Sequence, residues 1–461
     1  MFPMHIGPLI LFITLITHFQ VSGKPTILST NENILHFYYH DSLGFGHQVN
    51  ARKGTTKLLI NSPILLFEAN KNQTPYLIYP GESLSITKDK KGFSVFTING
   101  NAERNNELLF FADLIKGSGS IYMTFPLHTY QGKSNNLEQL QVYENEIKNV
   151  RKQRENILNS YTKQNKVSSS FKSIAENILL STALKDSMLL YRNNKGLLTT
   201  NKIYDKKIRQ LIEGVNRIAY SQFMPYLVTA LLPVSITINN SSEFFIKTNS
   251  DFIKAFVFID RNFNKMVKNF LLARTIYTAL NNNLSVPPHY LEKFYRECTD
   301  VGYTRLVKTK IAEKKLASLL PKGESVVLLL DGSTQTLNKV IQGNKGKLIY
   351  LDFWASWCSP CRDEMVSSAV LADTFKTREV IFIYLSIDTN TSDWSKASQE
   401  EDLKKENSYL ILNAEKSPLI IKYKIHTIPR YMLIGKNSQI ISTNAPRPSD
   451  SSVIALIKKH L

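Results

Sequence analysis

The stretch from Leu348 to Met365 constrains the chain more than any other. It reads LIYLDFWASWCSPCRDEM, so an apolar run leads into two cysteines that are separated by two residues. A short β-branched and aromatic run followed by C-x-x-C predicts a buried strand that delivers two thiols to the start of a helix. We therefore expect an α/β domain that carries a redox-active dithiol.

The residues around this stretch alternate between strand and helix patterns from position 320 to the C-terminus. Strands are predicted at 326–330, 348–353, 380–387, 409–412, 430–434 and 439–442. Helices are predicted at 358–376, around 393–404, at 417–423 and at 452–460. Such alternation predicts a central mixed sheet with helices on both faces.

The sequence before residue 320 divides into a region with strand patterns and a region with helix patterns. Residues 24–104 contain β-rich runs at 34–39, 57–60, 64–67 and 93–98 with turn residues between them, which favours a small antiparallel β-sandwich. Residues 105–319 switch to helical spacing, with patterns over 140–161, 171–192, 203–231, 251–282 and 288–320 and breaks at 193–194, Pro233 and 286–288. No fixed period indicates a repeat array, so we expect an all-α region.

The first 23 residues resemble an export signal. Residues 6–21 are almost wholly apolar and small residues precede Lys24, which predicts a cleaved signal peptide at 1–23. The first residues lack Lys and Arg, so an uncleaved membrane anchor is the alternative. The predicted division is thus 1–23, 24–104, 105–319 and 320–461.

Charge and cysteine content exclude several classes of protein. The 57 Lys and Arg against 38 Asp and Glu give +19, which indicates basic solvated helix faces, because no basic cluster interleaved with aromatics marks a nucleic-acid surface. Three cysteines are too few for a disulfide-stapled fold. The C-x-x-C lacks the second ligand pair that structural zinc needs, so no metal is expected. Cys298 is expected on a helix as a small buried hydrophobe; a partner for mixed disulfides is the alternative.

The dithiol needs a thiolate and a base. Cys358 is expected as the first residue of its helix, where the unpaired N–H groups and the macrodipole stabilise a thiolate. Cys361 lies three residues on, on the same helical face, and can attack a mixed disulfide formed at Cys358. Asp352 in the buried strand is the leading base, because burial raises a carboxyl pKa; a strand-end Asp bonded to the backbone is the alternative. Glu364 is the second candidate, with a solvent-facing Glu as its alternative.

Residues 320–461 resemble the thioredoxin superfamily, specifically the TlpA/ResA-like extracytoplasmic thiol–disulfide oxidoreductases. The resemblance is carried by three stretches: DFWASWCSPCR at 352–362, YLSID at 384–388 followed by Trp394, and TIP at 427–429. The preceding region is similar to the N-terminal extension of such proteins from Bacteroidota-type bacteria.

The resemblance implies a thioredoxin-like fold and a role for each matching residue. Cys358 and Cys361 would be the nucleophile and the resolving thiol of a redox-active disulfide, while Asp352 and Glu364 would serve proton transfer. Pro429 would be a cis-proline facing the dithiol. The implied substrate-binding residues are Trp357, Ser359, Pro360, Ile428 and Pro429.

The implied function is reduction of protein disulfides in the periplasm or cell envelope, without a cofactor, by a protein fed by a membrane-embedded electron donor. Two departures bear on this. Ser359 replaces the commoner Gly between the cysteines, which leaves a dithiol oxidase open, and Val366 replaces a helix-kinking Pro. A further alternative is an envelope binding or assembly protein, in which residues 24–319 do the work and the dithiol domain is a redox-gated or vestigial dock.

Overall fold

The computed structural model describes residues 24–69, 74–118, 133–218, 246–319, 323–376, 379–404, 406–412 and 414–461. These residues fall into two compact units, 24–307 and 308–461. The expected signal peptide at 1–23 and the break at Pro233 lie outside the described residues. Within the described ranges, no helix combines the length and the apolarity that crossing a membrane requires.

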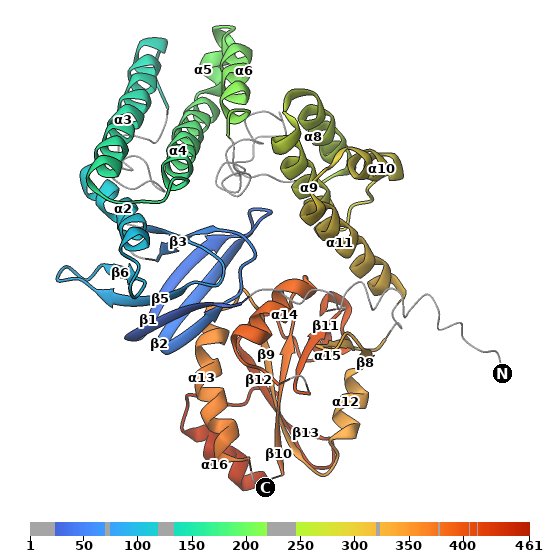
Figure 1. Ribbon diagram of the computed structural model, residues 1–461. Coiled ribbons are helices and arrows are strands. Elements are labelled where there is room, and N and C mark those ends of the chain that lie inside the picture. The colour runs from blue at the N-terminus through green and yellow to red at the C-terminus, as the bar shows by residue number, and fades with distance from the viewer. Residues whose placement is uncertain are drawn as a thin grey trace. The chain divides into compact units, whose positions relative to one another are not determined.

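The first unit begins with a sheet of six strands (blue in Figure 1): β1 (Thr26–His40), β2 (Gly46–Leu58), β3 (Ile64–Glu68), β4 (Pro75–Ile78), β5 (Ser83–Lys88) and β6 (Ser94–Thr97). The strand order is β4-β3-β1-β5-β6, and β2 also pairs with β1. The β1–β5 pair is parallel and the other pairs are antiparallel.

This sheet differs from the expected all-antiparallel arrangement in one strand pair. The described strands form one hydrogen-bonded sheet, and the parallel β1–β5 pair was not predicted. The reason is the length of β1: β2 pairs along nearly all of it, while β5 pairs with residues 27–30 and β3 with residues 37–38. A sandwich of two stacked sheets is therefore not confirmed.

Strand β3 joins the sheet to the helices that follow. Ile64 and Leu66 belong to the apolar core of the sheet, whereas Leu65 and Phe67 belong to a second core that includes Phe110 of a helix. This division follows from the period of two in a strand, because successive side chains point to opposite faces. A strand buried on both faces reads as the continuous apolar run found at 64–67.

The helices of this unit are α2 (Ala102–Ser118), α3 (Leu137–Gln164), α4 (Phe171–Asn193), α5 (Lys195–Thr200), α6 (Tyr204–Val215), α8 (Asn249–Asn262), α9 (Lys265–Asn281), α10 (Pro288–Glu297) and the start of α11 (Val301–Leu319). The helical character predicted for this region is confirmed where the structure describes it.

Two of the expected long helices are each divided. The pattern at 251–282 forms α8 and α9, because the Asn264 side chain accepts a hydrogen bond from the N–H of Val267 and starts a new helix. The pattern at 288–320 forms α10 and α11, and Asp300 accepts from the N–H of Tyr303 at the second start. Cys298 lies between them as the residue that caps the end of α10, so the expected helical position is wrong. Its side chain is half-buried.

The second unit contains a seven-stranded sheet, in orange and red in Figure 1: β7 (Val326–Leu329), β8 (Thr334–Thr336), β9 (Leu348–Trp354), β10 (Val380–Ser386), β11 (Ser408–Ile411), β12 (Arg430–Ile434) and β13 (Ile440–Ser442). The order is β13-β12-β9-β10-β11-β7-β8. The three central strands are parallel and the outer pairs are antiparallel, which confirms the predicted mixed sheet.

The helices of this unit are α12 (Leu337–Gly343), α13 (Ser359–Thr374), α14 (Thr391–Glu400), α15 (Pro418–Lys422) and α16 (Ser452–His460), with a short 3-10 turn at Ala414–Lys416. Figure 1 shows α13 and α16 on one side of the sheet and α12 on the other. Strand β8 and helix α12 were not predicted. Their apolar positions are too few to make a period visible, although Thr336 caps α12 by accepting from the N–H of Lys339.

Strand β9 places its residues on two faces in alternation. Tyr350 and Trp354 share one apolar core with Cys358 and Cys361, whereas Ile349, Leu351 and Phe353 belong to the core on the other face. Asp352 stands between Tyr350 and Trp354 in this alternation, so its side chain points to the face that carries the dithiol.

Candidate active site

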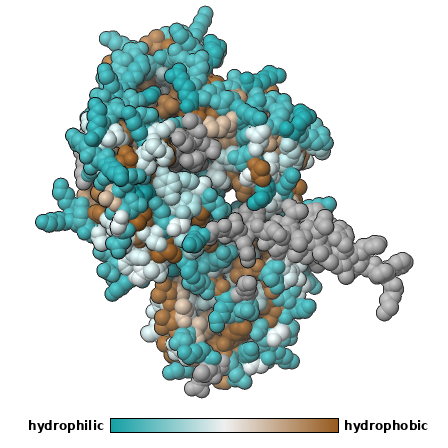
Figure 2. Space-filling model, in the orientation of Figure 1, coloured by the Kyte–Doolittle hydropathy of each residue, from teal (hydrophilic) through white to brown (hydrophobic). Residues whose placement is uncertain are grey.

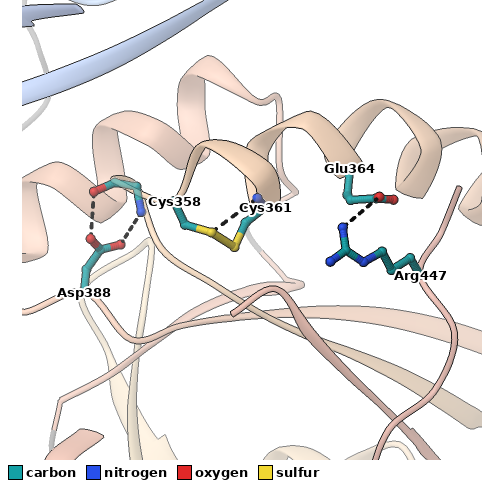
Figure 3. The surroundings of a disulfide bond; sticks show 6 residues. Cys358, Cys361, Glu364, Asp388 and Arg447 are labelled. Carbon is teal, nitrogen blue, oxygen red and sulfur yellow. Dashed lines mark hydrogen bonds and ion pairs between the residues drawn. A yellow bond between two sulfur atoms is a disulfide. The ribbon is translucent and has the colours of Figure 1, made fainter. Parts of the chain in front are cut away.

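The two cysteines of the C-x-x-C motif form a disulfide, shown in Figure 3. The Sγ atoms of Cys358 and Cys361 are 2.00 Å apart. Cys358 is the N-cap of α13, with an extended backbone, and its Sγ accepts a hydrogen bond from the N–H of Cys361 at 3.3 Å. Helix α13 therefore begins at Ser359 and ends at Thr374, which corrects the predicted 358–376. The N-cap position aims the sulfur at the unpaired N–H groups of the first turn.

The disulfide itself is buried, but its rim is open. Cys358 is 4% exposed and Cys361 is 1% exposed, whereas the neighbouring Trp357 is 59% exposed. Pro360 is exposed and Ser359 is half-buried. The structure thus presents the buried sulfurs beneath a rim formed by the residues before and between them.

Pro429 lies at the same end of the sheet. Arg430, the next residue, pairs with Phe353 near the C-terminal end of β9, because β12 runs antiparallel to β9. The chain leaves that end of β9 toward Cys358. The Ile428–Pro429 peptide bond is cis, as the resemblance implies, and both residues are half-buried.

Asp352 is buried in β9 at 2% exposure. Neither carboxylate oxygen has a hydrogen-bond partner among the residues that the structure describes, so the backbone-bonded alternative is not supported. Burial raises the pKa of Asp352 well above its usual value, and the charge of Glu364 adds to the rise. The Tyr431 hydroxyl, from the strand position that pairs with Asp352, is likewise buried without a partner in the described chain.

Glu364 is buried as well, and it is held by a distant segment. Its carboxylate accepts hydrogen bonds from the N–H of Ser449 at 3.0 Å and from the Ser449 hydroxyl at 2.8 Å. The Nη1 of Arg447 lies 3.8 Å from the Oε1 of Glu364, and Figure 3 marks this ion pair with a dashed line. The alternative of a solvent-facing Glu364 is therefore wrong.

A third buried carboxylate, Asp388, was not among the predicted site residues. It accepts hydrogen bonds from the N–H of Ser356 at 2.9 Å and from the Ser356 hydroxyl at 2.7 Å, as Figure 3 shows, and from the Ser386 hydroxyl at 2.7 Å. Burial nevertheless raises its pKa. Ser356 precedes Cys358 by two residues, so Asp388 fixes the turn that carries the first cysteine. Its position in the YLSID stretch, which carries part of the family resemblance, is the sequence feature that could have identified Asp388 as a site residue.

Arg362 holds the other side of the motif. Its guanidinium is buried and donates to Glu401 at 2.7 Å and to Glu400 at 3.0 Å, at the end of α14. These carboxylates outweigh the cost of burial and raise the pKa of Arg362. Arg362, which directly follows Cys361, is therefore held by the end of α14, and the start of α14 lies shortly after Asp388 in the chain.

Apolar side chains reach the surface of this unit. Figure 2 shows hydrophobic residues gathered on its visible face, in the lower part of the view. The exposed large apolar side chains of the unit include Trp357 and, on α13, Val366 and Val370. No group of three or more His, Cys, Asp or Glu side chains suited to a metal occurs within the described ranges.

Comparison with known proteins gives consistent matches for this unit. A family model described as thioredoxin-like matches residues 346–440. The thiol–disulfide oxidoreductase ResA of Bacillus cereus is 26% identical over 145 residues, which are 31% of this chain and 79% of that protein. The sporulation thiol–disulfide oxidoreductase A of Bacillus subtilis is 30% identical over 117 residues, or 23% of this chain and 68% of that protein.

A solved structure of a Bacteroides vulgatus protein, assigned as a thiol–disulfide oxidoreductase, is 32% identical and covers 31% of this chain and 94% of that chain, with a TM-score of 0.26. The residues matched by the family model include Cys358, Cys361, the buried strand β9 and Pro429. Through its C-terminal unit, the chain belongs to the thioredoxin-like thiol–disulfide oxidoreductases.

Proposed function

We propose that the protein reduces disulfides of other proteins in the cell envelope through Cys358 and Cys361. The observation that carries this proposal is the buried Cys358–Cys361 disulfide at the start of α13, which directly follows the exposed Trp357 in the chain. A sulfur that faces helix N–H groups is stabilised as a thiolate once the disulfide is reduced. Exposed apolar side chains beside it suit a protein substrate.

The reaction proceeds in two exchanges. The Cys358 thiolate attacks one sulfur of the substrate disulfide, forms a mixed disulfide, and releases the other substrate sulfur as a thiolate that takes up a proton. The Cys361 thiolate then attacks the Sγ of Cys358, restores the internal disulfide and releases the second substrate thiol. Two electrons pass from the dithiol to the substrate, and a dithiol donor in the membrane restores them.

Asp352 serves the second exchange in this proposal. Cys361 is buried and must lose its proton before it attacks, and a carboxyl whose pKa is raised by burial is suited to accept one. Glu364 is the second proton-transfer group, held in place by Ser449. Trp357, Ser359, Pro360, Ile428 and Pro429 form the rim that receives the substrate, with the backbone of Ile428 pairing with it.

Reduction of insulin disulfides tests the activity. Cys358→Ala should lose the activity completely, whereas Cys298→Ser should keep it, because Cys298 lies outside the dithiol unit. Full activity of Cys358→Ala would refute the proposal. Deletion of residues 24–319 that abolishes function in cells, together with a functional Cys358→Ser, would instead support a binding or assembly protein.

Trapping tests the mechanism and the direction of electron flow. Cys361→Ser should hold substrate on Cys358 as a mixed disulfide in envelope extracts, and Cys358→Ser should not. A reduction potential near the thioredoxin value of about −270 mV would agree with a reductase, whereas one near about −120 mV would mark a dithiol oxidase.

A further inference from the structure

The middle of α11 carries a buried ion pair that the proposed dithiol chemistry does not use. Lys310 and Glu313 lie one turn apart, with the Nζ of Lys310 3.3 Å from the Oε2 of Glu313. Both side chains are nearly enclosed, and both residues belong to the same compact unit as the dithiol. Two charges removed from water need close hydrogen-bond partners.

The pair contacts the segment that starts α14. Lys310 donates from Nζ to the carbonyl oxygen of Thr389 at 2.8 Å. The Oε1 of Glu313 accepts hydrogen bonds from the hydroxyl and, at 3.3 Å, from the N–H of Thr391. Thr391 is buried and opens α14. Helix α11 therefore holds residues 389–391 through one positively charged and one negatively charged side chain.

That segment leads directly to the dithiol. Asp388 precedes Thr389 and holds both the N–H and the hydroxyl of Ser356, two residues before Cys358. The far end of α14 holds Arg362 through Glu400 and Glu401. The stretch from 388 to 401 thus fixes the C-x-x-C motif on both sides, and α11 fixes the start of that stretch.

We propose that Lys310 and Glu313 are positioning residues of the dithiol, acting through residues 388–391 on Ser356. The turn they fix sets how the Sγ of Cys358 faces the N–H groups at the start of α13, and those groups stabilise the thiolate. A looser turn weakens this stabilisation, so the thiol of Cys358 ionises at higher pH. The inference rests on the proposed function, because it assigns these residues to the same reactive centre.

The test uses Thr391→Val and Thr391→Ser in the full chain, each in a Cys298→Ser background. Valine keeps the shape of threonine and its backbone N–H but lacks the hydroxyl that donates to Glu313, whereas serine keeps that hydroxyl. Two properties are measured: the equilibrium constant of the dithiol against a glutathione buffer, and the pH profile of the alkylation rate of Cys358. Thr391→Val should change the equilibrium constant at least about threefold and move the pH profile upward, while Thr391→Ser should match the parent.

A double-mutant cycle that combines Thr391→Val with Ser356→Ala then tests whether α11 acts on the dithiol through Ser356. The shifts of Thr391→Val and Ser356→Ala should be clearly non-additive, because both act on one hydrogen-bond network. If Thr391→Val lowers only the melting temperature and leaves both properties unchanged, the contact is merely structural and the inference falls. Should Thr391→Val not fold, Glu313→Gln, which removes the charge but keeps an acceptor, decides by the same criterion. Absence of any reversible dithiol equilibrium in the parent protein would refute the proposed function instead.

Discussion

Each of the two sheets contains a buried carboxylate, but the two carboxylates differ in their hydrogen-bond partners. Glu68, in β3 of the first unit, accepts hydrogen bonds from Lys88 at 2.6 Å and from the Ser94 hydroxyl at 2.7 Å. Asp352, in β9 of the second unit, has no hydrogen-bond partner in the described part of the chain. Both side chains are almost completely buried.

The difference separates a buried carboxylate that has close partners from one that has none, and the second is the group that we propose as a proton acceptor. A buried charge with close partners lowers the energy of the native state relative to the same charge without them. An unpartnered buried carboxyl avoids this cost by staying protonated, because burial raises its pKa. Native proteins bury few such groups, and a role in chemistry is one of the reasons for which they are kept.

The largest effect that would test this comparison is expected at the partnered site. Glu68→Leu should lower the free energy of unfolding by about 3 kcal/mol, the low end for a broken buried pair, because Lys88 retains partial contact with water. Urea unfolding of the oxidised protein measures the loss. Activity per folded molecule should not change. The double variant Glu68→Leu with Lys88→Met should regain most of the loss, and a double variant as unstable as the single one would contradict this assignment.

Asp352→Asn should show the converse pattern. The second exchange should slow about 100-fold, the lower range for a lost proton acceptor, equal to about 2.7 kcal/mol in activation free energy. Stability should stay equal or rise, because folding no longer requires the carboxyl at this position to take up a proton. Single-turnover decay of the mixed disulfide measures the step. Asp373→Asn, at an exposed position of the same helix as Cys361, is the control and should leave the rate unchanged.

The pH dependence of stability sharpens the contrast further. The pKa of Asp352 is raised in the folded state, so between about pH 4 and that folded value the native protein binds more protons than the unfolded chain. Stability must therefore fall as pH rises through this window. Relative to Asp352→Asn, the wild type should lose about 1.4 kcal/mol per pH unit. Urea titrations from pH 4 to pH 7 measure the difference, and a constant difference would show that Asp352 is not buried in this way.

The features that sequence could supply are the local ones. Alternation along β9 places Asp352 on the face of Tyr350 and Trp354, and the C-x-x-C spacing places both thiols at the start of α13. Thr427-Ile428-Pro429 marks the start of β12, and the register of β12 against β9 puts that start near the dithiol. The positions of Asp352, the two thiols and Pro429 within their own elements each follow from a short run of residues, whereas the register of β12 against β9 comes from the structure.

The features that sequence could not supply depend on distant partners. The bonds of Ser356 to Asp388 span 32 residues, and those of Ser449 to Glu364 span 85. Nothing in the spacing of Glu364 distinguishes a buried side chain from an exposed one until Ser449 is brought to it. The parallel pairing of β1 with β5 could not be predicted for the same reason, because it joins strands that several others separate in the chain.

The smallest expected effect concerns Glu364, which is partnered like Glu68 but lies near the dithiol like Asp352. Arg447 is 3.8 Å from its carboxylate and its side chain is 56% exposed, so Arg447→Ala should change the free energy of unfolding by less than about 1 kcal/mol. The change should vanish in about 1 M salt, where the screening length is about 3 Å. Ser449→Ala removes a direct hydrogen bond to a buried carboxylate. It should lower the free energy of unfolding by about 1 to 3 kcal/mol, which is more than Arg447→Ala. If Arg447→Ala has the larger effect, the charge rather than the hydrogen bonds of Ser449 holds Glu364, and Glu364 belongs with Glu68 as an ion-paired group.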